Sequence, residues 1–239
     1  MTTGIFIKTC LKDLCWLRFC LESISRFGSG FESVVIVADS DCRDEMSKLP
    51  QIGQEVVFVE MWENGYIQQQ WVKINADQYT GTDQVLFVDS DCVFHTPFSP
   101  ESFTRDGKPI LLKTRYSDLP DSKVGRVTQK WRGITRSVVG WDVEWEYMRR
   151  IPIIILSSTL TGFRQMLPDL ESRLRSIKGH DFSEFNAIGA FTEKMDHEKY
   201  YISDTSVWVH DTVAEQFWSW GGLTEEVKSK IEGYLRQKA

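Results

Sequence analysis

The first hundred residues alternate between two periods of hydrophobic and polar positions. Continuous apolar runs of strand length occupy residues 4–9, 33–38, 55–60 and 84–91. Segments with helical spacing lie between them, at residues 11–27, 41–49 and 65–79. Strands that are apolar on both faces and alternate with helices predict a mostly parallel sheet covered by helices on both sides. The expected fold class is therefore α/β.

After Pro97 the pattern is less regular. The runs PILLKT and IIIL predict strands, and residues 157–177 predict a helix interrupted at Pro168. Residues 183–195 predict a helix with Ser183 as its N-cap. Further expected elements are a helix over GWDVEWEYMRR (140–150), strands at 200–204 and 206–211, and a terminal helix at 224–238. The basic segment before residue 140 has few apolar residues at any period, so it is expected to be irregular.

The composition is that of a soluble globular chain. The 239 residues fit one domain, and the pattern changes near residue 100 without a linker. No apolar run reaches the ~20 residues of a membrane span, and the N-terminus does not resemble a signal peptide. Five cysteines with no C-x-x-C spacing favour reduced thiols over disulfides or a zinc site. We therefore expect a cytoplasmic protein.

The tetrapeptide DSDC closes two of the predicted strands, at residues 39–42 and 89–92. The first copy is followed by Arg43, Asp44 and Glu45, whose acids suit the positive N-terminal end of a helix. The second copy continues as Cys92, Val93 and Phe94, which predicts a short strand rather than a helix. The carboxylates of the second copy are therefore not explained by a helix start.

The second copy is a candidate metal site. In an extended D-x-D the two carboxylates point the same way, and ligands of parallel sheets gather at the carboxyl ends of the strands. Hard divalent cations prefer such oxygen ligands and leave room for substrate phosphates. Asp89 and Asp91 are thus candidate ligands. A histidine, His210, follows the last predicted strand in SVWVHD.

The order of these features resembles the GT-A glycosyltransferases, which move a sugar from a nucleotide diphosphate donor. More closely, the chain resembles a group of bacterial and phage glycosyltransferase-like proteins that share GYIQQQWVKI before the D-x-D and an SEF-type helix start after it. The similarity covers residues 4–98 and, more weakly, 150–211. It implies a single GT-A domain, Rossmann-like, in which residues 1–98 bind the nucleotide sugar and residues 99–239 bind the acceptor.

The resemblance also implies roles for single residues. A UDP-sugar is the expected donor, and Mn²⁺ or Mg²⁺ the expected cofactor. Asp89 would contact the ribose or the metal, Asp91 would be a direct metal ligand, and His210 would be a further ligand of the metal or the diphosphate. The remaining donor-binding residues implied in this way are Lys8, Thr9, Asp39, Gln69, Gln70 and Lys73.

Sugar transfer creates negative charge on the leaving group and releases a proton from the acceptor hydroxyl. A bound divalent cation stabilises the nucleoside diphosphate leaving group as a Lewis acid. A carboxylate can take the proton of the acceptor hydroxyl, and Asp181 and Glu184 in GHDFSEFNAIG are the candidates. Glu184 could equally do no more than favour the start of its helix. A transfer that retains the configuration of the sugar requires no such base.

The acceptor is the least determined part. Residues 105–136 hold nine basic residues and three aspartates, a charge of +6 within a chain of net charge −6. Basic residues around an aromatic are typical of nucleic-acid binding, so Arg126, Lys130, Trp131 and Arg132 are candidate acceptor-binding residues. Related phage enzymes place sugars on hydroxymethylated pyrimidines of DNA, and we expect such a DNA acceptor. A saccharide or a lipid-linked sugar is the alternative acceptor, and a solvated loop is the alternative for the segment.

Two other classes of protein share part of these features. Haloacid dehalogenase-type phosphotransferases also use a D-x-D, but there it ends the first strand of the domain. Here three predicted strands precede it, and Cys92 and Val93 follow it. A non-catalytic nucleotide-binding module would share the same residues, and would differ from an enzyme in neither hydrolysing nor transferring the donor sugar.

Overall fold

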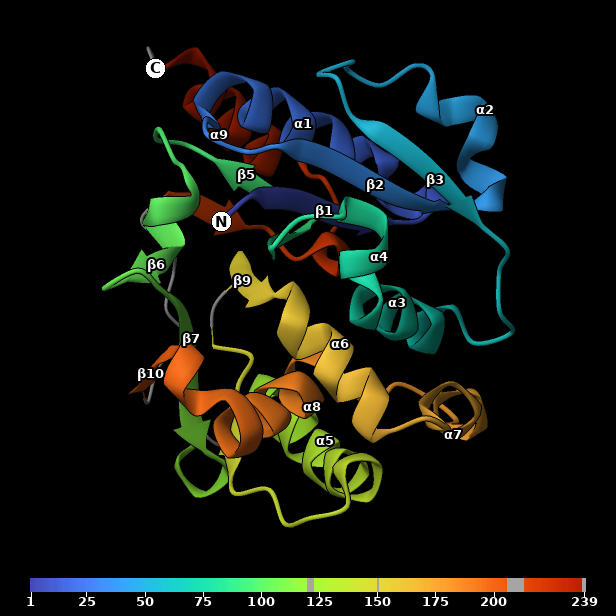
Figure 1. Cartoon of the computed structure of the whole chain (residues 1–239). Helices are drawn as coiled ribbons and strands as arrows, with labels where there is room; N and C mark the ends of the chain where they lie inside the picture. The colour runs from blue at the N-terminus through green and yellow to red at the C-terminus, as the bar shows by residue number, and fades with distance from the viewer. Residues whose placement is uncertain (120–122, 150, 206–212, 238–239) are drawn as a thin grey trace.

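The structure is a computed structural model that describes residues 1–119, 123–149, 151–205 and 213–237. Its central sheet has five strands in the order β3-β2-β1-β4-β9 (Figure 1). Four are parallel and the fifth, β9, runs antiparallel to β4. Their bounds are β1 Thr3–Thr9, β2 Ser33–Asp39, β3 Glu55–Val59, β4 Gln84–Asp89 and β9 Ile153–Leu156. The predicted α/β class with a mostly parallel sheet is confirmed.

Helices cover both faces of this sheet. In Figure 1, α1 (Leu14–Phe27) lies on one side, and α3 (Gly65–Ile74), α4 (Ala76–Thr80) and α6 (Ser157–Met166) lie on the other. The predicted helix over residues 65–79 is thus divided in two. The division falls at Asn75, whose side-chain amide donates to the carbonyl of Trp71 at 2.8 Å. A short helix, α2 (Arg43–Met46), follows β2.

A second sheet forms in the later part of the chain. Its central strand is β7 (Lys108–Arg115), which pairs with β10 (Tyr201–Asp204), β6 (Thr104–Arg105) and β8 (Trp145–Glu146). Helices α5 (Lys123–Val139) and α8 (Glu184–Phe191) lie beside it, whereas α7 (Leu170–Ser176) packs against α3 (Figure 1). Single 3-10 or π turns occur at Leu11–Asp13, Ser40–Cys42, Pro100–Phe103, Tyr116–Asp118, Thr192–Asp196, His197–Lys199 and Ser219–Gly221.

After residue 150, the structure confirms the helix break predicted at a proline and the helix starts predicted at hydroxyl residues. α6 and α7 are separated around Pro168, as predicted. Ser183 is the N-cap of α8, and its hydroxyl accepts a hydrogen bond from the amide of Asn186 at 3.4 Å. The terminal helix α9 spans Glu225–Arg236, with Thr224 as its cap.

Two predicted elements are wrong. The basic segment is not irregular, because Lys123–Val139 form α5. Its inner face includes buried Thr128 and Thr135 and half-buried Trp131 beside buried Val138 and Val139, and a count of aliphatic residues leaves the first three out. GWDVEWEYMRR is not a helix, since its aromatic residues and Val143 recur every second position and Trp145–Glu146 pair with β7.

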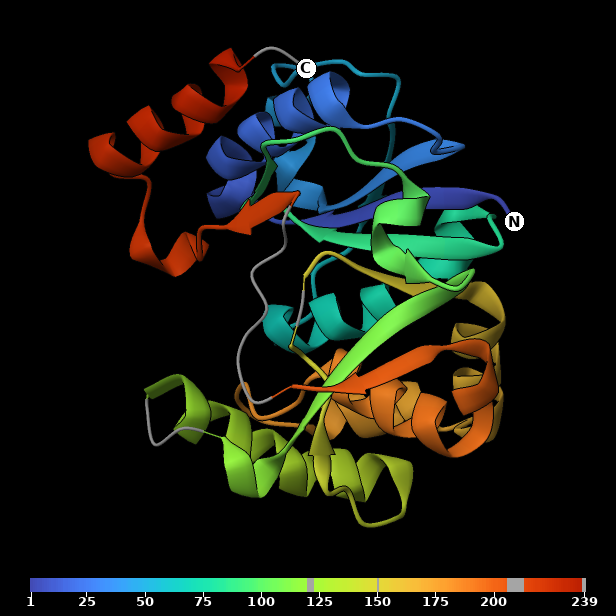
Figure 2. The ribbon, with the colours of Figure 1, turned by 90° about the vertical axis from the view of Figure 1, so that its left-hand side faces the viewer.

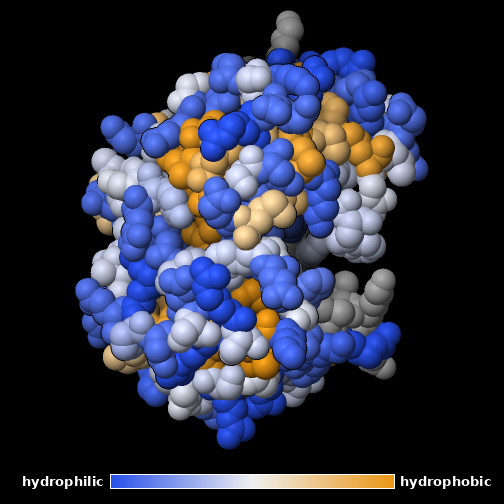
Figure 3. Space-filling model, turned by 90° about the vertical axis from the view of Figure 1, so that its right-hand side faces the viewer, coloured by the Kyte–Doolittle hydropathy of each residue, from blue (hydrophilic) through white to orange (hydrophobic). Residues whose placement is uncertain are grey.

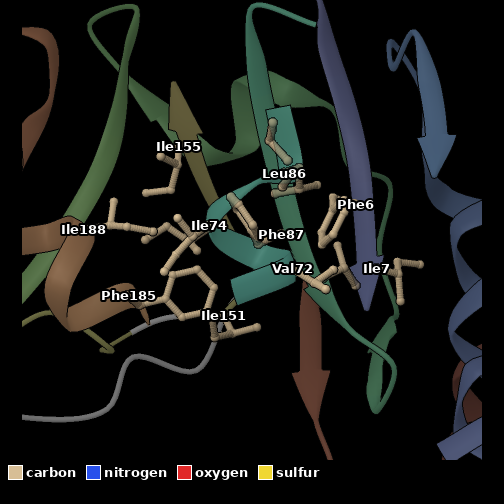
Figure 4. Packing of buried hydrophobic residues seen from close by; sticks show 14 of the residues in the cluster. Phe6, Ile7, Val72, Ile74, Leu86, Phe87, Ile151, Ile155, Phe185 and Ile188 are labelled. Atoms are coloured by element: carbon tan, nitrogen blue, oxygen red, sulfur yellow. The ribbon is translucent and has the colours of Figure 1, made fainter. Parts of the chain in front are cut away.

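The two halves of the chain share one core. Figure 4 shows Ile155 and Ile188, from the second half, packed with Ile74 and Phe87 from the first. The space-filling view in Figure 3 shows the surface hollowed between the upper part of the molecule and the lower part. Strand β9, which comes from the second half of the chain, belongs to the first sheet. The division into a donor-binding half (residues 1–98) and an acceptor-binding half (residues 99–239) stays a prediction.

The C-terminal segment also returns to the first half. Strand β11 (Ala214–Gln216) pairs antiparallel with β5 (Cys92–Phe94). Ile231 of α9 is buried with Trp16 and Val93 in a small separate cluster. Among the described residues, no helix combines the length and the apolar character that crossing a membrane requires. The five cysteines are free thiols.

Candidate functional site

The carboxyl ends of β1, β2 and β4 bring three predicted donor residues to one edge of the sheet. In the strand register Lys8 lies beside Asp89, and Asp39 ends the neighbouring strand on the other side. The ammonium of Lys8 binds a carboxylate oxygen of Asp39 at 2.7 Å and donates to the carbonyl of Thr9 at 2.6 Å. Lys8 and Asp39 are both buried. Lys8 therefore neutralises Asp39 within the site.

A second buried lysine joins the D-x-D to α8. The ammonium of Lys73 on α3 lies 2.8 Å from a carboxylate oxygen of Asp89 and 3.1 Å from one of Glu184. Burial alone would lower the pKa of Lys73, but the charges of Asp89 and Glu184 outweigh it and raise that pKa. Lys73 therefore stays charged, and one cation holds two carboxylates from elements far apart in the sequence.

The remaining residues of α3 support this arrangement. The side-chain oxygen of Gln70 accepts a hydrogen bond from the amide of Glu184 at 3.0 Å, which fixes the first residue of α8 against α3. Gln69 is half-buried on the same helix. Burial raises the pKa of Glu184; Lys73 opposes that shift, whereas Asp89 reinforces it. Buried Lys73, Gln70 and Glu184 thus form one connected network with half-buried Asp89.

The second residue of the D-x-D is held by the C-terminal segment. Asp91 is 8% exposed and accepts a hydrogen bond from the amide of Ser219 at 2.7 Å. The side-chain amide nitrogen of Gln216 lies 3.1 Å from Asp89 and 3.4 Å from Asp91, so it contacts both carboxylates. Burial and the neighbouring Asp89 raise the pKa of Asp91 to about 6. The described protein groups therefore stabilise the ionised form of Asp91 less than water would.

The two DSDC copies occupy different environments. Asp41 is exposed in the 3-10 turn after β2, and α2 begins two residues later with Asp44 and Glu45 in its first turn. The helix start predicted for the first copy is confirmed. Asp89 and Asp91 of the second copy converge on a common side-chain nitrogen, as two cation ligands would on an ion.

The other predicted site residues are not all brought to this edge. Asp181 is exposed in the loop before α8, whereas Glu184 is 2% exposed, so the two candidate bases do not share an environment. His210 lies outside the described residues. Within the described ranges no group of three or more histidine, cysteine, aspartate or glutamate side chains is arranged to hold a metal ion.

The predicted acceptor residues all lie on α5. Arg126 and Lys130 are exposed. The indole nitrogen of Trp131 donates to the carbonyl of His180 at 3.2 Å, and the guanidinium of Arg132 donates to the carbonyl of Val143 at 2.8 Å. In Figure 2, α5 lies in the lower part of the molecule, whereas the orange-red arrow of β11 lies at the level of the central sheet. Trp131 and Arg132 are therefore engaged in contacts that hold α5 in place.

Sequence reasoning missed Gln216 and Ser219. Gln216 belongs to a strand of three residues, and Ser219 contributes only a backbone amide. Neither has a chemical signature in the sequence. The one available signal was the segment EQFWSWGG itself, whose aromatic and glycine residues indicate a packed turn near the end of the chain.

Comparison with known proteins adds one finding. No protein-family model matches the chain, and no curated protein matches its sequence. One solved structure that matches it is the apo-form of the glycosyltransferase GlyE of Streptococcus pneumoniae TIGR4, with 14% sequence identity and a TM-score of 0.46. The match covers 85% of this chain and 45% of the GlyE chain, so the matched region is less than half the length of that protein.

Proposed function

We propose that this protein is a metal-dependent glycosyltransferase that moves a sugar from a nucleoside diphosphate sugar to a hydroxyl acceptor. The observation that carries the proposal is the group of three carboxylates, Asp89, Asp91 and Glu184, linked through Lys73 and Gln216 at the carboxyl edge of a parallel sheet. This edge is where α/β sheets bind their ligands. With all the groups ionised, the acids exceed the lysine by two charges, which suits one divalent cation.

The residues present fit Mn²⁺ or Mg²⁺. Asp89 and Asp91 would hold the ion through carboxylate oxygens, the donor type that both metals prefer. The raised pKa of Asp91 supports this fit, because a neighbouring cation would stabilise the ionised carboxylate that burial disfavours. When bound, such a cation stabilises the negative charge of the departing nucleoside diphosphate.

The protein's own residues would prepare this site. Lys73 binds one oxygen of Asp89 and leaves the other turned toward Gln216 and Asp91. Glu184 holds Lys73 in that position. Its burial and ion pair favour a positioning role for Glu184 over that of a base, whereas Asp181 is exposed and can reach solvent. If the acceptor hydroxyl requires a carboxylate base, Asp181 is the candidate we favour.

The donor nucleotide would bind beside Asp89. Lys8, Thr9 and Asp39 end the two neighbouring strands there, and a UDP-sugar remains the donor we expect. We retain the hydroxymethylpyrimidine of DNA as a proposed acceptor. Its support is the exposed Arg126 and Lys130 on α5, and a saccharide or lipid-linked sugar is the alternative.

The two rival functions make different demands on the site. A phosphotransferase of the haloacid dehalogenase type would require its D-x-D at the end of the first strand, whereas here it ends β4. A non-catalytic nucleotide-binding module could use the same residues, so only turnover distinguishes it from an enzyme.

A screen of donors and acceptors tests the proposal. The purified protein is incubated with nucleotide sugars and Mn²⁺, with hydroxymethylated DNA, unmodified DNA or oligosaccharides, and products are identified by mass spectrometry. We expect a glycosylated product, loss of that product in EDTA, and loss in Asp91→Ala but not in Asp41→Ala. Donor binding without hydrolysis or transfer under any condition would favour the non-catalytic module.

A further inference from the structure

Gln216 is placed between the two carboxylates of the D-x-D although it is 125 residues from Asp91 in the chain. Strand β11 delivers it, because Gln216 is the register partner of Cys92, the residue that follows Asp91. Alternation along β11 sends the neighbouring Glu215 the other way, where it pairs with Lys230 at 2.7 Å. The backbone pairing thus directs the Gln216 side chain to the acidic edge.

The two carboxylates converge on a single atom of this side chain. The amide nitrogen of Gln216 contacts an oxygen of Asp89 at 3.1 Å and an oxygen of Asp91 at 3.4 Å. Lys73 and Ser219 occupy the other oxygen of each carboxylate. The oxygens that face Gln216 are therefore the ones available to a cation, and the carboxamide lies against both.

The other end of the same amide has no partner among the described residues. The side-chain oxygen of Gln216 is buried and makes no hydrogen bond with any of the described residues. A buried carbonyl without a partner costs about 1–3 kcal/mol, so a native structure seldom keeps one without a reason. Rotation by 180° about the last side-chain bond exchanges the nitrogen and the oxygen. The oxygen would then face the position between Asp89 and Asp91.

We propose that Gln216 supplies, through its side-chain oxygen, a third protein ligand to a divalent cation held by Asp89 and Asp91. This inference rests on the proposed function, which places that cation at the D-x-D. The amide has two uses. With its nitrogen toward the carboxylates it separates two negative charges, and with its oxygen there it completes a set of oxygen ligands of the kind that Mn²⁺ and Mg²⁺ bind. A neutral third ligand also keeps the protein charge at the ion to the two aspartates.

Replacement of Gln216 by leucine and by glutamate tests this role. Mn²⁺ binding to the full chain, without donor, is measured by electron paramagnetic resonance of the free ion at pH 8. Gln216→Leu removes the oxygen and should weaken Mn²⁺ binding by at least about tenfold, the lower end of what lost metal-site contacts cost. Gln216→Glu adds a charged oxygen and should tighten binding. The matched controls are Gln78→Leu and Gln78→Glu, at an exposed glutamine of α4.

The two substitutions separate a ligand from a spacer between charges. If Gln216 only keeps the carboxylates apart, Gln216→Leu keeps them apart as well and should bind Mn²⁺ as the parent does. Unchanged binding by Gln216→Leu, or binding by Gln216→Glu that is no tighter than the parent's, overturns the inference. If the leucine variant does not fold, Gln216→Met, which also lacks the oxygen, takes its place. The inference and the proposed function fail differently, because a parent protein that binds no Mn²⁺ refutes the metal site itself.

Discussion

Replacing Asp91 by asparagine should stabilise the protein when no divalent cation is present. Burial and Asp89 raise the pKa of Asp91 from 3.8 to about 6. The folded state therefore binds this proton more tightly than the unfolded state does. Between pH 4 and 6 the unfolded chain loses the proton first, so the contribution of Asp91 to the free energy of unfolding falls as the pH rises.

The size of the effect follows from the shift. About two pKa units at roughly 1.4 kcal/mol each correspond to about 3 kcal/mol of stability lost by pH 7. Asparagine has nearly the same shape, cannot ionise, and keeps an oxygen that can accept the hydrogen bond from Ser219. Asp91→Asn should therefore unfold at pH 7 in EDTA with a free energy up to about 3 kcal/mol higher than the parent, and the two should converge near pH 4.

Urea denaturation between pH 4 and 8, with EDTA or with Mn²⁺, measures this directly. Mn²⁺ at about 1,000 times its Kd should reverse the order, because it adds about 4.1 kcal/mol to the parent and little to the variant. Asp41→Asn is the matched control, at the exposed aspartate of the first DSDC, and should show neither effect. A variant that is no more stable than the parent at pH 7 in EDTA would show that the charge of Asp91 is already compensated.

Three other outcomes are expected. Asp91→Ala should abolish sugar transfer at saturating Mn²⁺ while Asp41→Ala keeps most of it, and equal losses in a rate assay would contradict the choice between the two copies. Lys73→Met should lower the free energy of unfolding by about 3–5 kcal/mol in urea titrations, because buried Glu184 and half-buried Asp89 lose their cation; a loss under 1 kcal/mol would refute its role in the network. If DNA is the acceptor, replacing Arg126 and Lys130 by alanine should flatten the salt dependence of DNA binding by up to about 2 units of log K per log salt, and an unchanged slope measured by fluorescence anisotropy would remove α5 from the interface.

The first half of the fold could be predicted because its strands are apolar on both faces. Runs such as SVVIVA have one stable use in a soluble protein, the interior of a covered parallel sheet. The choice of the second DSDC followed from local residues too, since Asp44 and Glu45 begin a helix and Val93 and Phe94 do not. In these segments, the residue types within a few positions were enough to predict the local structure.

The network around Lys73 could be predicted only in part. Lys73 and Asp89 are 16 residues apart in the sequence, and Gln70 and Glu184 are 114 residues apart. Local sequence patterns do not indicate that residues so far apart in the chain are in contact. Gln216 was missed for the same reason, because its role arises from pairing between β5 and β11. The helix α5 was missed because threonine and tryptophan, beside a few aliphatic residues, form part of its inner face.

The return of β11 and α9 to the first half has a consequence for synthesis. At about 5–20 residues per second, the 125 residues between Asp91 and Gln216 take the ribosome roughly 6–25 seconds. During that interval the acidic pair has emerged without the side chain that bridges it, and the apolar faces of Trp16 and Val93 have no Ile231 to cover them. A chain that stops before residue 214 therefore carries an unfinished site together with exposed apolar surface, the feature that chaperones and proteases recognise. Completion of the site and burial of Trp16 and Val93 depend on the same segment, β11 and α9.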